Sequence, residues 1–342
     1  MMLRPILIAR PPCPSSRSTA AREFSNGRIN PRAQHHERYF VYDKPANDRM
    51  ELGGAPSRVV SWPFPKVSSG DGSPDQAEFL VAPFAPVAPA GCSALACLEQ
   101  SRVFAEQLAW FMRRPAHHIL FDAADCDWVH PCLADSIVFK ASSNHRDSSV
   151  LALPYLVRDP GEGPSITEAT VDISFQGSTD THPIRRALES YRRSWPGKAV
   201  EFFSIGQQFM SLNPDARRLL GEMYWAQMWR SRFVLCPRGR GLNSRRFFET
   251  LAAGRIPVLI SDSVKLPLEG LIDYSEFTVR VPEGFVRFLN EHIDHFRETH
   301  DLATASGSAR AAYLTYFSSR RFMDFIETSL WWSGRIKDAA VW

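Results

Sequence analysis

Arginine is concentrated in one short part of this sequence, residues 228–255, which holds seven arginines and a single acid, Glu249. This segment carries a charge of +6, while the whole chain carries only +3. Four of its arginines surround two glycines, in the order Arg238, Gly239, Arg240, Gly241, Arg245, Arg246. Arginine forms charge-assisted, often bidentate, hydrogen bonds with phosphate oxygens, and glycine lets the backbone approach a ligand closely. We therefore predict a site for a small anion, best fitted by a diphosphate, rather than a nucleic-acid-binding face.

A strand, a turn, a helix and a second strand must position these arginines. Residues 233–236 and 256–260 are apolar runs that predict parallel strands. The helix between them begins at Asn243 or Ser244, which are both N-cap types, and ends before Gly254. Its buried face is predicted to consist of Phe247, Phe248, Leu251 and Ala252. Ligands of open parallel sheets bind at the carboxyl ends of the strands, beside the next helix N-terminus, where the turn places its arginines.

Glu249 and Arg245 allow two interpretations. On the first, Glu249 accepts hydrogen bonds from the ribose hydroxyls of a nucleotide bound at the turn. On the second, the two residues form an ordinary i,i+4 ion pair on the helix surface, and the other arginines are solvated. The turn matches neither the Gly-x-Gly-x-x-Gly pattern of dinucleotide sites nor the P-loop. Neither a dinucleotide nor ATP is therefore the expected ligand.

A second polar segment, residues 117–132, holds three histidines, three aspartates and two cysteines. Asp125, Cys126 and Asp127 form an Asp-x-Asp sequence, and two carboxylates after a strand could hold Mg²⁺ or Mn²⁺. The alternative is a polar loop without a metal, at the end of the strand predicted over residues 118–122. We favour the polar loop, because no second metal-site motif accompanies the Asp-x-Asp.

The rest of the chain predicts an α/β protein of about two domains. Apolar residues make up 44% and charged residues 23%, which excludes a mainly disordered, collagen-like or coiled-coil chain. Short strands alternate with helices, as in layered α/β architectures. Further strands are predicted over residues 79–82, 137–140, 150–154, 172–176 and 199–204.

Helices are predicted around residues 184–193, from Asn213-Pro214 onward, and over the aromatic-rich stretch 310–332. The pattern of the middle helix suggests one apolar face that is lined by Leu219, Leu220, Met223 and Met228. Residues 158–165, rich in proline and glycine, form the best candidate for a linker.

Signals for targeting and membrane insertion are weak. The six cysteines form no C-x-x-C pair, which is typical of reduced thiols in a cytoplasmic protein. No apolar run reaches the roughly 18 residues of a membrane span. Residues 1–35 are basic and interrupted by prolines, so we expect a disordered tail, either a targeting segment or an overextended start. A soluble or peripherally membrane-associated protein of the cytoplasm is expected.

The arginine-rich region resembles the signature of the exostosin family, glycosyltransferase family 47. Residues 233–283 read FVLCPRGRGLNSRRFFETLAAGRIPVLISDSVKLPLEGLIDYSEFTVRVPE. They share with the family the CPRG step, the pattern S-x-R-x-x-E-x-L-x-x-G-x-I-P-V, a Leu-Pro step and a Tyr-Ser-x-Phe element. Weaker matches precede them in the family's order: Tyr39–Asp43, His118–Phe121, Phe175-x-Gly177, Ile184-Arg185 and Leu188.

This resemblance implies a GT-B fold, in which two Rossmann-like α/β domains face each other across a cleft. It implies an acceptor-side domain over residues 36–160 and a nucleotide-sugar-binding domain over residues 161–305. The C-terminal helices, residues 306–342, would pack back on the first domain. The implied donor residues are Arg185 and Arg246 at the diphosphate, Arg238, Gly239 and Arg240 in the loop, Ser244 as helix cap and Glu249 at the ribose.

The implied function is inverting, metal-independent transfer of a sugar from a UDP-sugar to a glycan or glycoconjugate hydroxyl, without a cofactor. A single displacement needs a general base for the acceptor hydroxyl and stabilisation of the departing diphosphate. Asp122, at a predicted strand end, is the first candidate for the base, and His118 is the second, although a histidine there is more often a core residue. His117 stands where family members often carry Asp. The alternatives are a non-catalytic module that binds an anionic glycan or nucleotide, and a metal-dependent Asp-x-Asp glycosyltransferase.

Overall fold

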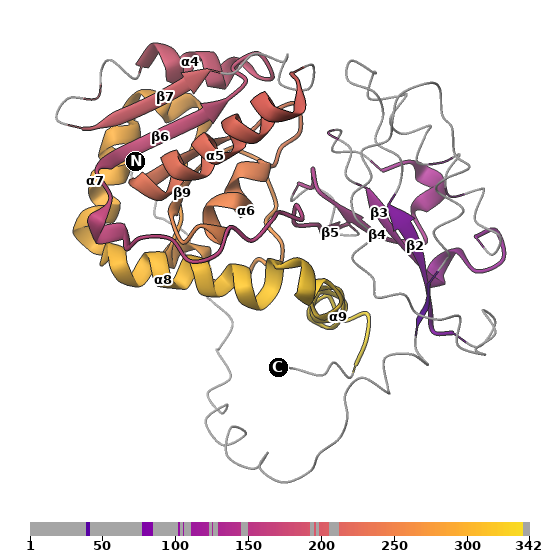
Figure 1. Ribbon diagram of the computed structural model, residues 1–342. Coiled ribbons are helices and arrows are strands. Elements are labelled where there is room, and N and C mark those ends of the chain that lie inside the picture. Colours follow the sequence, from indigo (N-terminus) through magenta and orange to yellow (C-terminus); the bar gives the residue numbers. More distant parts are fainter. Residues whose placement is uncertain are drawn as a thin grey trace, which may run out of the picture.

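The fold of a computed structural model of the chain is built on two parallel sheets, which lie in separate halves of the molecule (Figure 1). The structure describes residues 39–41, 77–84, 102, 105, 111–122, 125, 129–144, 150–191, 195, 198–204 and 212–337. The predicted tail over residues 1–35 lies outside this part of the chain. The prediction of an α/β fold with two Rossmann-like units, the GT-B arrangement, is confirmed.

The first sheet has five strands in the order β1-β2-β3-β4-β5. Its strands are β1 (Tyr39–Val41), β2 (Phe79–Phe84), β3 (His118–Asp122), β4 (Ile137–Lys140) and β5 (Leu151–Ala152), and each pairs in parallel with its neighbour. All residues of β3 and β4 are buried, as is usual for parallel strands covered on both faces. The bounds of β3 and β4 are those predicted, whereas β5 is shorter than its predicted range.

The second sheet has the order β10-β9-β8-β6-β7. Its strands are β6 (Val171–Gly177), β7 (Val200–Ser204), β8 (Ser231–Pro237), β9 (Ile256–Ile260) and β10 (Val279–Val281). The chain runs from β6 outward to β7 and then returns to the other side of β6 to form β8. The strand order therefore reverses between β6 and β8, and such a switch point is where open parallel sheets bind ligands.

Helices connect and cover these strands (Figure 1). They are α4 (Pro183–Tyr191), α5 (Pro214–Arg230), α6 (Arg245–Ala252), α7 (Leu289–Thr299), α8 (Leu302–Ala312) and α9 (Phe322–Trp332). The predicted start of α5 is confirmed, because the side chain of Asn213 accepts a hydrogen bond from the Ala216 N–H at 2.8 Å. Gly254, after α6, has a φ of 61°, the left-handed conformation expected of a residue that ends a helix.

The prediction of a single apolar face on α5 is wrong. Met228 is 2% exposed, but Leu219 is 56% exposed and Met223 is 49% exposed. Leu219 and Met228 are nine residues apart, which is two and a half helical turns, so they lie on opposite sides of the helix.

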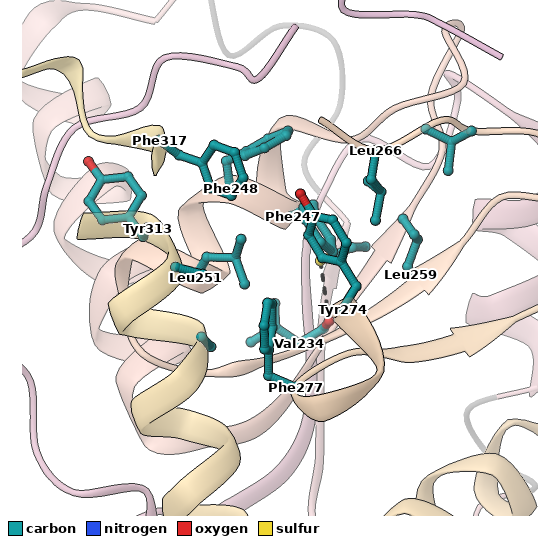
Figure 2. Packing of buried hydrophobic residues seen from close by; sticks show 14 of the residues in the cluster. Val234, Phe247, Phe248, Leu251, Leu259, Leu266, Tyr274, Phe277, Tyr313 and Phe317 are labelled. Atoms are coloured by element: carbon teal, nitrogen blue, oxygen red, sulfur yellow. Dashed lines mark hydrogen bonds between the residues drawn. The ribbon is translucent and has the colours of Figure 1, made fainter. Parts of the chain in front are cut away.

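The inner face of α6 is the centre of the larger hydrophobic core (Figure 2). The side chains of Phe247, Phe248 and Leu251 are fully buried, as the sequence predicted. Phe248 packs edge-on against Phe317, from the π-helical turn Tyr313–Phe317 that follows α8, with ring centroids 5.4 Å apart. The C-terminal segment therefore fixes the orientation of the helix that carries the site.

The C-terminal segment then reaches the first sheet. The ring of Phe322 in α9 lies 5.6 Å from that of Phe121 in β3, and the ring of Phe325 lies 6.0 Å from that of Phe139 in β4. The last helix thus links the two halves of the molecule. Within the described part of the chain, no helix is long and apolar enough to span a membrane.

Candidate functional site

The carboxyl ends of β6 and β8 bring the N-terminal ends of two helices together at the switch point of the second sheet. The helix after β6 contributes Arg185, and the helix after β8 contributes Arg246. Both guanidinium groups lie over the ring of Phe175, with their Cζ atoms 5.9 Å and 4.4 Å from its centroid. The two arginines that the family resemblance implies at the diphosphate therefore lie in one place.

Arg185 holds the turn after β8 in position. It donates hydrogen bonds to the backbone carbonyls of Pro237, Arg238 and Ser178, at 3.1, 2.9 and 3.0 Å. Burial, together with the charge of Arg246, lowers the pKa of Arg185 to about 9. Arginine stays protonated in proteins, so partial burial beside a second positive charge is unfavourable for Arg185. An anion bound between the two guanidinium groups would relieve that cost.

Arg246 is 8% exposed, although it carries a charge. Its Nη2 donates to the backbone carbonyl of Gln176, whereas its Nε and Nη1 are buried without a hydrogen-bond partner among the described residues. A β-carbon at Gly177 would overlap Nη2 of Arg246, so any other residue there would displace the guanidinium from its present position. Leaving charged N–H groups buried and unpaired is costly, which indicates that a ligand normally accepts from them.

Other unpaired polar atoms surround the same turn. Among the described residues, Thr181 Oγ1, Arg238 Nε and Asn243 Nδ2 are also buried without a partner. A β-carbon at Gly239 would lie 3.3 Å from Arg185 Nη2 and 3.7 Å from Thr181 Oγ1, so this glycine keeps the turn close to both. The orphaned groups are mostly hydrogen-bond donors, as expected of a site for a phosphate-bearing ligand.

Three other residues predicted at the donor site, Arg238, Arg240 and Ser244, belong to the turn after β8 and the start of α6. Arg238 forms a 3.7 Å ion pair with Glu283, and Arg240 is exposed. Ser244 is the N-cap residue of α6, but its side chain makes no capping hydrogen bond, which corrects that part of the prediction. The Phe247 N–H donates to the Ser244 backbone carbonyl at 2.9 Å rather than to the serine hydroxyl. The N-terminus of α6 also contributes the positive end of the helix dipole to the site.

Glu249 has two partners. Its Oε1 accepts from Arg245 at 3.1 Å, which is the i,i+4 pair considered as the alternative, and its Oε2 accepts from the hydroxyl of Tyr224 at 2.5 Å. Burial and the charge of Glu249 raise the pKa of Tyr224 well above its ordinary value. Sequence reasoning missed Tyr224, since nothing in its helical spacing connects it to a residue 25 positions away.

The two residues predicted as candidates for the base, Asp122 and His118, are both buried in the first half. The carboxylate of Asp122 is 2.5 Å from Lys140 Nζ, and the two residues are 6% and 0% exposed. His118 is fully buried, its Nδ1 lies 2.9 Å from the Arg114 carbonyl, and burial lowers its pKa. A general base must reach the acceptor hydroxyl, and the catalytic role of either side chain stays a prediction. The interpretation of His118 as a core histidine is confirmed.

We expect Asp122→Asn to act on stability rather than selectively on turnover. Removing one charge of a buried ion pair leaves the other charge uncompensated and costs about 3–5 kcal/mol, so urea unfolding should show a loss of this order. The matched control is Glu222→Gln, which breaks the exposed Arg218–Glu222 pair and should change the unfolding free energy by less than about 1 kcal/mol. A stable Asp122→Asn variant with greatly reduced turnover would instead support Asp122 as the base.

Asp125 is the carboxylate from the first half that lies beside the arginine turn. A β-carbon at Gly241 would lie 3.1 Å from Asp125 Oδ1 and 3.1 Å from Ser142 Oγ. The Leu242 N–H donates to that same Ser142 hydroxyl at 3.0 Å, so the turn is fastened to the first half here. Burial raises the pKa of Asp125, while the charges of Arg240, Lys140 and Arg185 oppose that rise.

Asp127, the other carboxylate of the Asp-x-Asp sequence, lies outside the described residues. Within the described part of the chain, no three histidine, cysteine, aspartate or glutamate side chains are grouped so that they could hold a metal ion.

The fold and the site define a class: a two-unit α/β protein with two arginine side chains together at the switch point of its second sheet. The Exostosin GT47 domain matches residues 113–294, more than half of the chain. The protein belongs to the exostosin family, glycosyltransferase family 47, as its arginine-rich region predicted.

Three comparisons show the range of similarity. The chain is 26% identical over 193 residues to the "Probable glucuronoxylan glucuronosyltransferase IRX7" of Arabidopsis thaliana, which covers 53% of this chain and 42% of that protein. It is 51% identical over 53 residues to the "Exostosin-1 homolog" of Caenorhabditis elegans, over 16% of this chain and 14% of that one. The crystal structure of TarM aligns with a TM-score of 0.37 and 9% identity, over 67% of this chain and 57% of that one. The chain spans less than half the length of these two curated relatives.

Proposed function

We propose that this protein is a glycosyltransferase that transfers a sugar from a UDP-sugar to a hydroxyl of a glycan or glycoconjugate. The observation that carries the proposal is the meeting of Arg185 and Arg246 at the switch point, where the buried Arg246 guanidinium keeps Nε and Nη1 without a hydrogen-bond partner among the described residues. A diphosphate offers several charged acceptor oxygens to such a pair and to the N-terminus of α6. Membership in a glycosyltransferase family favours a sugar diphosphate over other anions.

The proposed reaction is a single displacement with inversion at the anomeric carbon. The acceptor oxygen forms a bond to that carbon as the bond to the β-phosphate oxygen breaks, and the electron pair leaves with UDP. Arg185, Arg246 and the first N–H groups of α6 would stabilise the charge that develops on the diphosphate. The acceptor proton passes to a carboxylate on the opposite side, for which we propose Asp125.

A panel of UDP-sugars tests the proposal through release of UDP. UDP-glucuronic acid is the first donor to try, because the Arabidopsis thaliana relative is named as a glucuronosyltransferase. We expect UDP release with at least one donor, and more of it when a glycan acceptor is present. UDP binding without turnover by any donor would favour a non-catalytic binding module instead.

We also propose that the transfer needs no metal ion. The guanidinium groups would supply the positive charge that a divalent cation provides in Asp-x-Asp enzymes. Turnover in excess EDTA should therefore remain within about two-fold of the untreated rate, by the same reasoning. Loss of turnover in EDTA, with recovery on addition of Mn²⁺, would contradict this proposal and favour Asp125 and Asp127 as metal ligands.

A further inference from the structure

The two halves of the molecule touch just after β4, at the segment formed by residues 142–144. Ser142, Ser143 and Asn144 are polar, yet they are only 0%, 1% and 8% exposed. Buried polar groups need hydrogen-bond partners, and the second half supplies several of them. They come from the turn after β8 and the loop after β9, so the carboxyl ends of strands from both sheets meet at this segment.

The first contact joins the segment to the arginine turn. The Leu242 N–H donates to the hydroxyl oxygen of Ser142 at 3.0 Å, across 100 residues of sequence. The carbonyl of the same Leu242 accepts from the hydroxyl of Ser261 at 2.8 Å, and Ser261 directly follows β9 in the second half. The backbone of one buried turn residue is therefore held by two serines, one from each half.

The second contact joins the segment to the loop after β9. The Lys265 N–H donates to the Ser143 carbonyl at 3.0 Å, and the Ser143 hydroxyl donates to the Lys265 carbonyl at 3.2 Å. Lys265 Nζ donates to the Val150 carbonyl at 2.9 Å, and Val264 forms an antiparallel bridge with Asn144. Several bonds in different directions fix the orientation of the two halves here more firmly than a single bond would.

These contacts lie beside the residues proposed for the reaction. A β-carbon at Gly241 would lie 3.1 Å from Ser142 Oγ and 3.1 Å from Asp125 Oδ1, so the hydroxyl and the carboxylate both lie against the turn. Leu242 precedes Arg246, in the first turn of α6, by four residues. The bond from Leu242 to Ser142 therefore ties the donor arginines to the half that carries Asp125.

We propose that Ser142 is a positioning residue for sugar transfer, an inference that rests on the function proposed above. Through Leu242, it sets the separation between the arginine turn, which would hold the donor, and Asp125, which would activate the acceptor. In this role the serine acts through the turn rather than on a substrate, so its removal leaves the guanidinium groups in place. The signature is a loss of kcat without a loss of UDP affinity, because a misplacement of about 1 Å can cost about 100-fold in rate.

A pair of serine variants tests this role. Ser142→Ala removes the acceptor of the Leu242 N–H, and the matched control Ser261→Ala removes the donor to the Leu242 carbonyl without touching a bond between the halves. We expect kcat of Ser142→Ala to fall by about 10–100-fold, with the Kd of UDP within about two-fold of the unaltered chain by calorimetric titration. Ser261→Ala should keep kcat within about three-fold, since the two halves stay aligned.

Melting temperatures separate positioning from stability. Each variant leaves one backbone group of Leu242 without its partner, so the two should lose similar stability. A difference between them in kcat then reflects alignment of the halves. If Ser142→Ala does not fold, Lys265→Met tests the second contact, because it removes the bond to the Val150 carbonyl and keeps the backbone bonds. Its kcat should fall by about 3–10-fold at unchanged UDP affinity.

The outcomes distinguish this inference from the proposed function. Equal kcat in Ser142→Ala and Ser261→Ala, whether both are lowered or neither is, would overturn the positioning role. Weaker UDP binding by Ser142→Ala at unchanged kcat would also overturn it, because the serine would then shape the donor site itself. Both results leave the glycosyltransferase function intact, whereas absence of UDP release by the unaltered chain with every donor would overturn that function.

Discussion

Replacing Arg246 with methionine should weaken UDP binding by about 10–100-fold, because a charge-assisted hydrogen bond contributes about 1.5–3 kcal/mol. Methionine retains most of the side-chain volume over the Phe175 ring and removes the charge. Turnover should fall further than binding, since loss of one donor to a developing negative charge typically costs about 10²–10³-fold in kcat. Calorimetric titration of UDP measures the first effect, and the initial rate at saturating donor measures the second.

The control for Arg246→Met is Arg218→Met on α5, which removes an equal charge from an exposed site with an i,i+4 partner. That variant should bind UDP normally and lose less than about 0.5 kcal/mol of stability. Melting temperatures of both variants show whether they are folded. If Arg246→Met is folded and binds UDP as tightly as the unaltered chain, the donor site is wrongly assigned, and the glycosyltransferase function loses its main support.

The arginine-rich unit could be predicted from sequence because its signals are local. The strand Ile256–Ile260, the buried face of α6 and the left-handed Gly254 all follow from apolar runs and glycine within about thirty residues. The prediction that its turn lies at a ligand site also depends only on strand-to-helix order. The contact between Arg185 and this turn could be expected only from the family resemblance. Arg185 donates to the carbonyls of Pro237 and Arg238, which are 52 and 53 residues away in the sequence.

The contacts that could not be predicted from the sequence are pairs formed only in three dimensions. Lys140 neutralises Asp122 because β3 and β4 are adjacent in the sheet, where Asp122 and Lys140 are register partners. Sequence alone gave Asp122 as a strand-end carboxylate but not what lies next to it. Tyr224 reaches Glu249 for a similar reason, through the packing of α5 against α6. A strand-end position shows where a side chain is, whereas its chemical role depends on its neighbour across the sheet.

We propose Asp125 as the catalytic base, and Asp122 stays the prediction made from the sequence. Asp125 belongs to the first half of the molecule but lies beside Gly241, in the turn that carries the arginines. A carboxylate there would be on the acceptor side of a donor held by Arg185 and Arg246. Asp125 is exposed to solvent, while partial desolvation beside the turn raises its pKa, and a higher pKa makes a carboxylate a stronger base for a hydroxyl proton.

Asp125→Asn should therefore lower kcat by about 10²–10⁴-fold, the usual contribution of a general base, while UDP affinity stays within a few-fold. Because the base acts only when ionised, kcat/KM of the unaltered chain should rise with pH through the raised pKa of Asp125 and then level off. That acid limb should disappear from the residual activity of Asp125→Asn. Asp127→Asn is the matched control, since it removes the neighbouring carboxylate and should leave the rate nearly unchanged in EDTA. Equal losses of kcat in both variants, each reversed by Mn²⁺, would show that the two aspartates hold a metal ion. Full activity of Asp125→Asn would show that the acceptor proton leaves by another route.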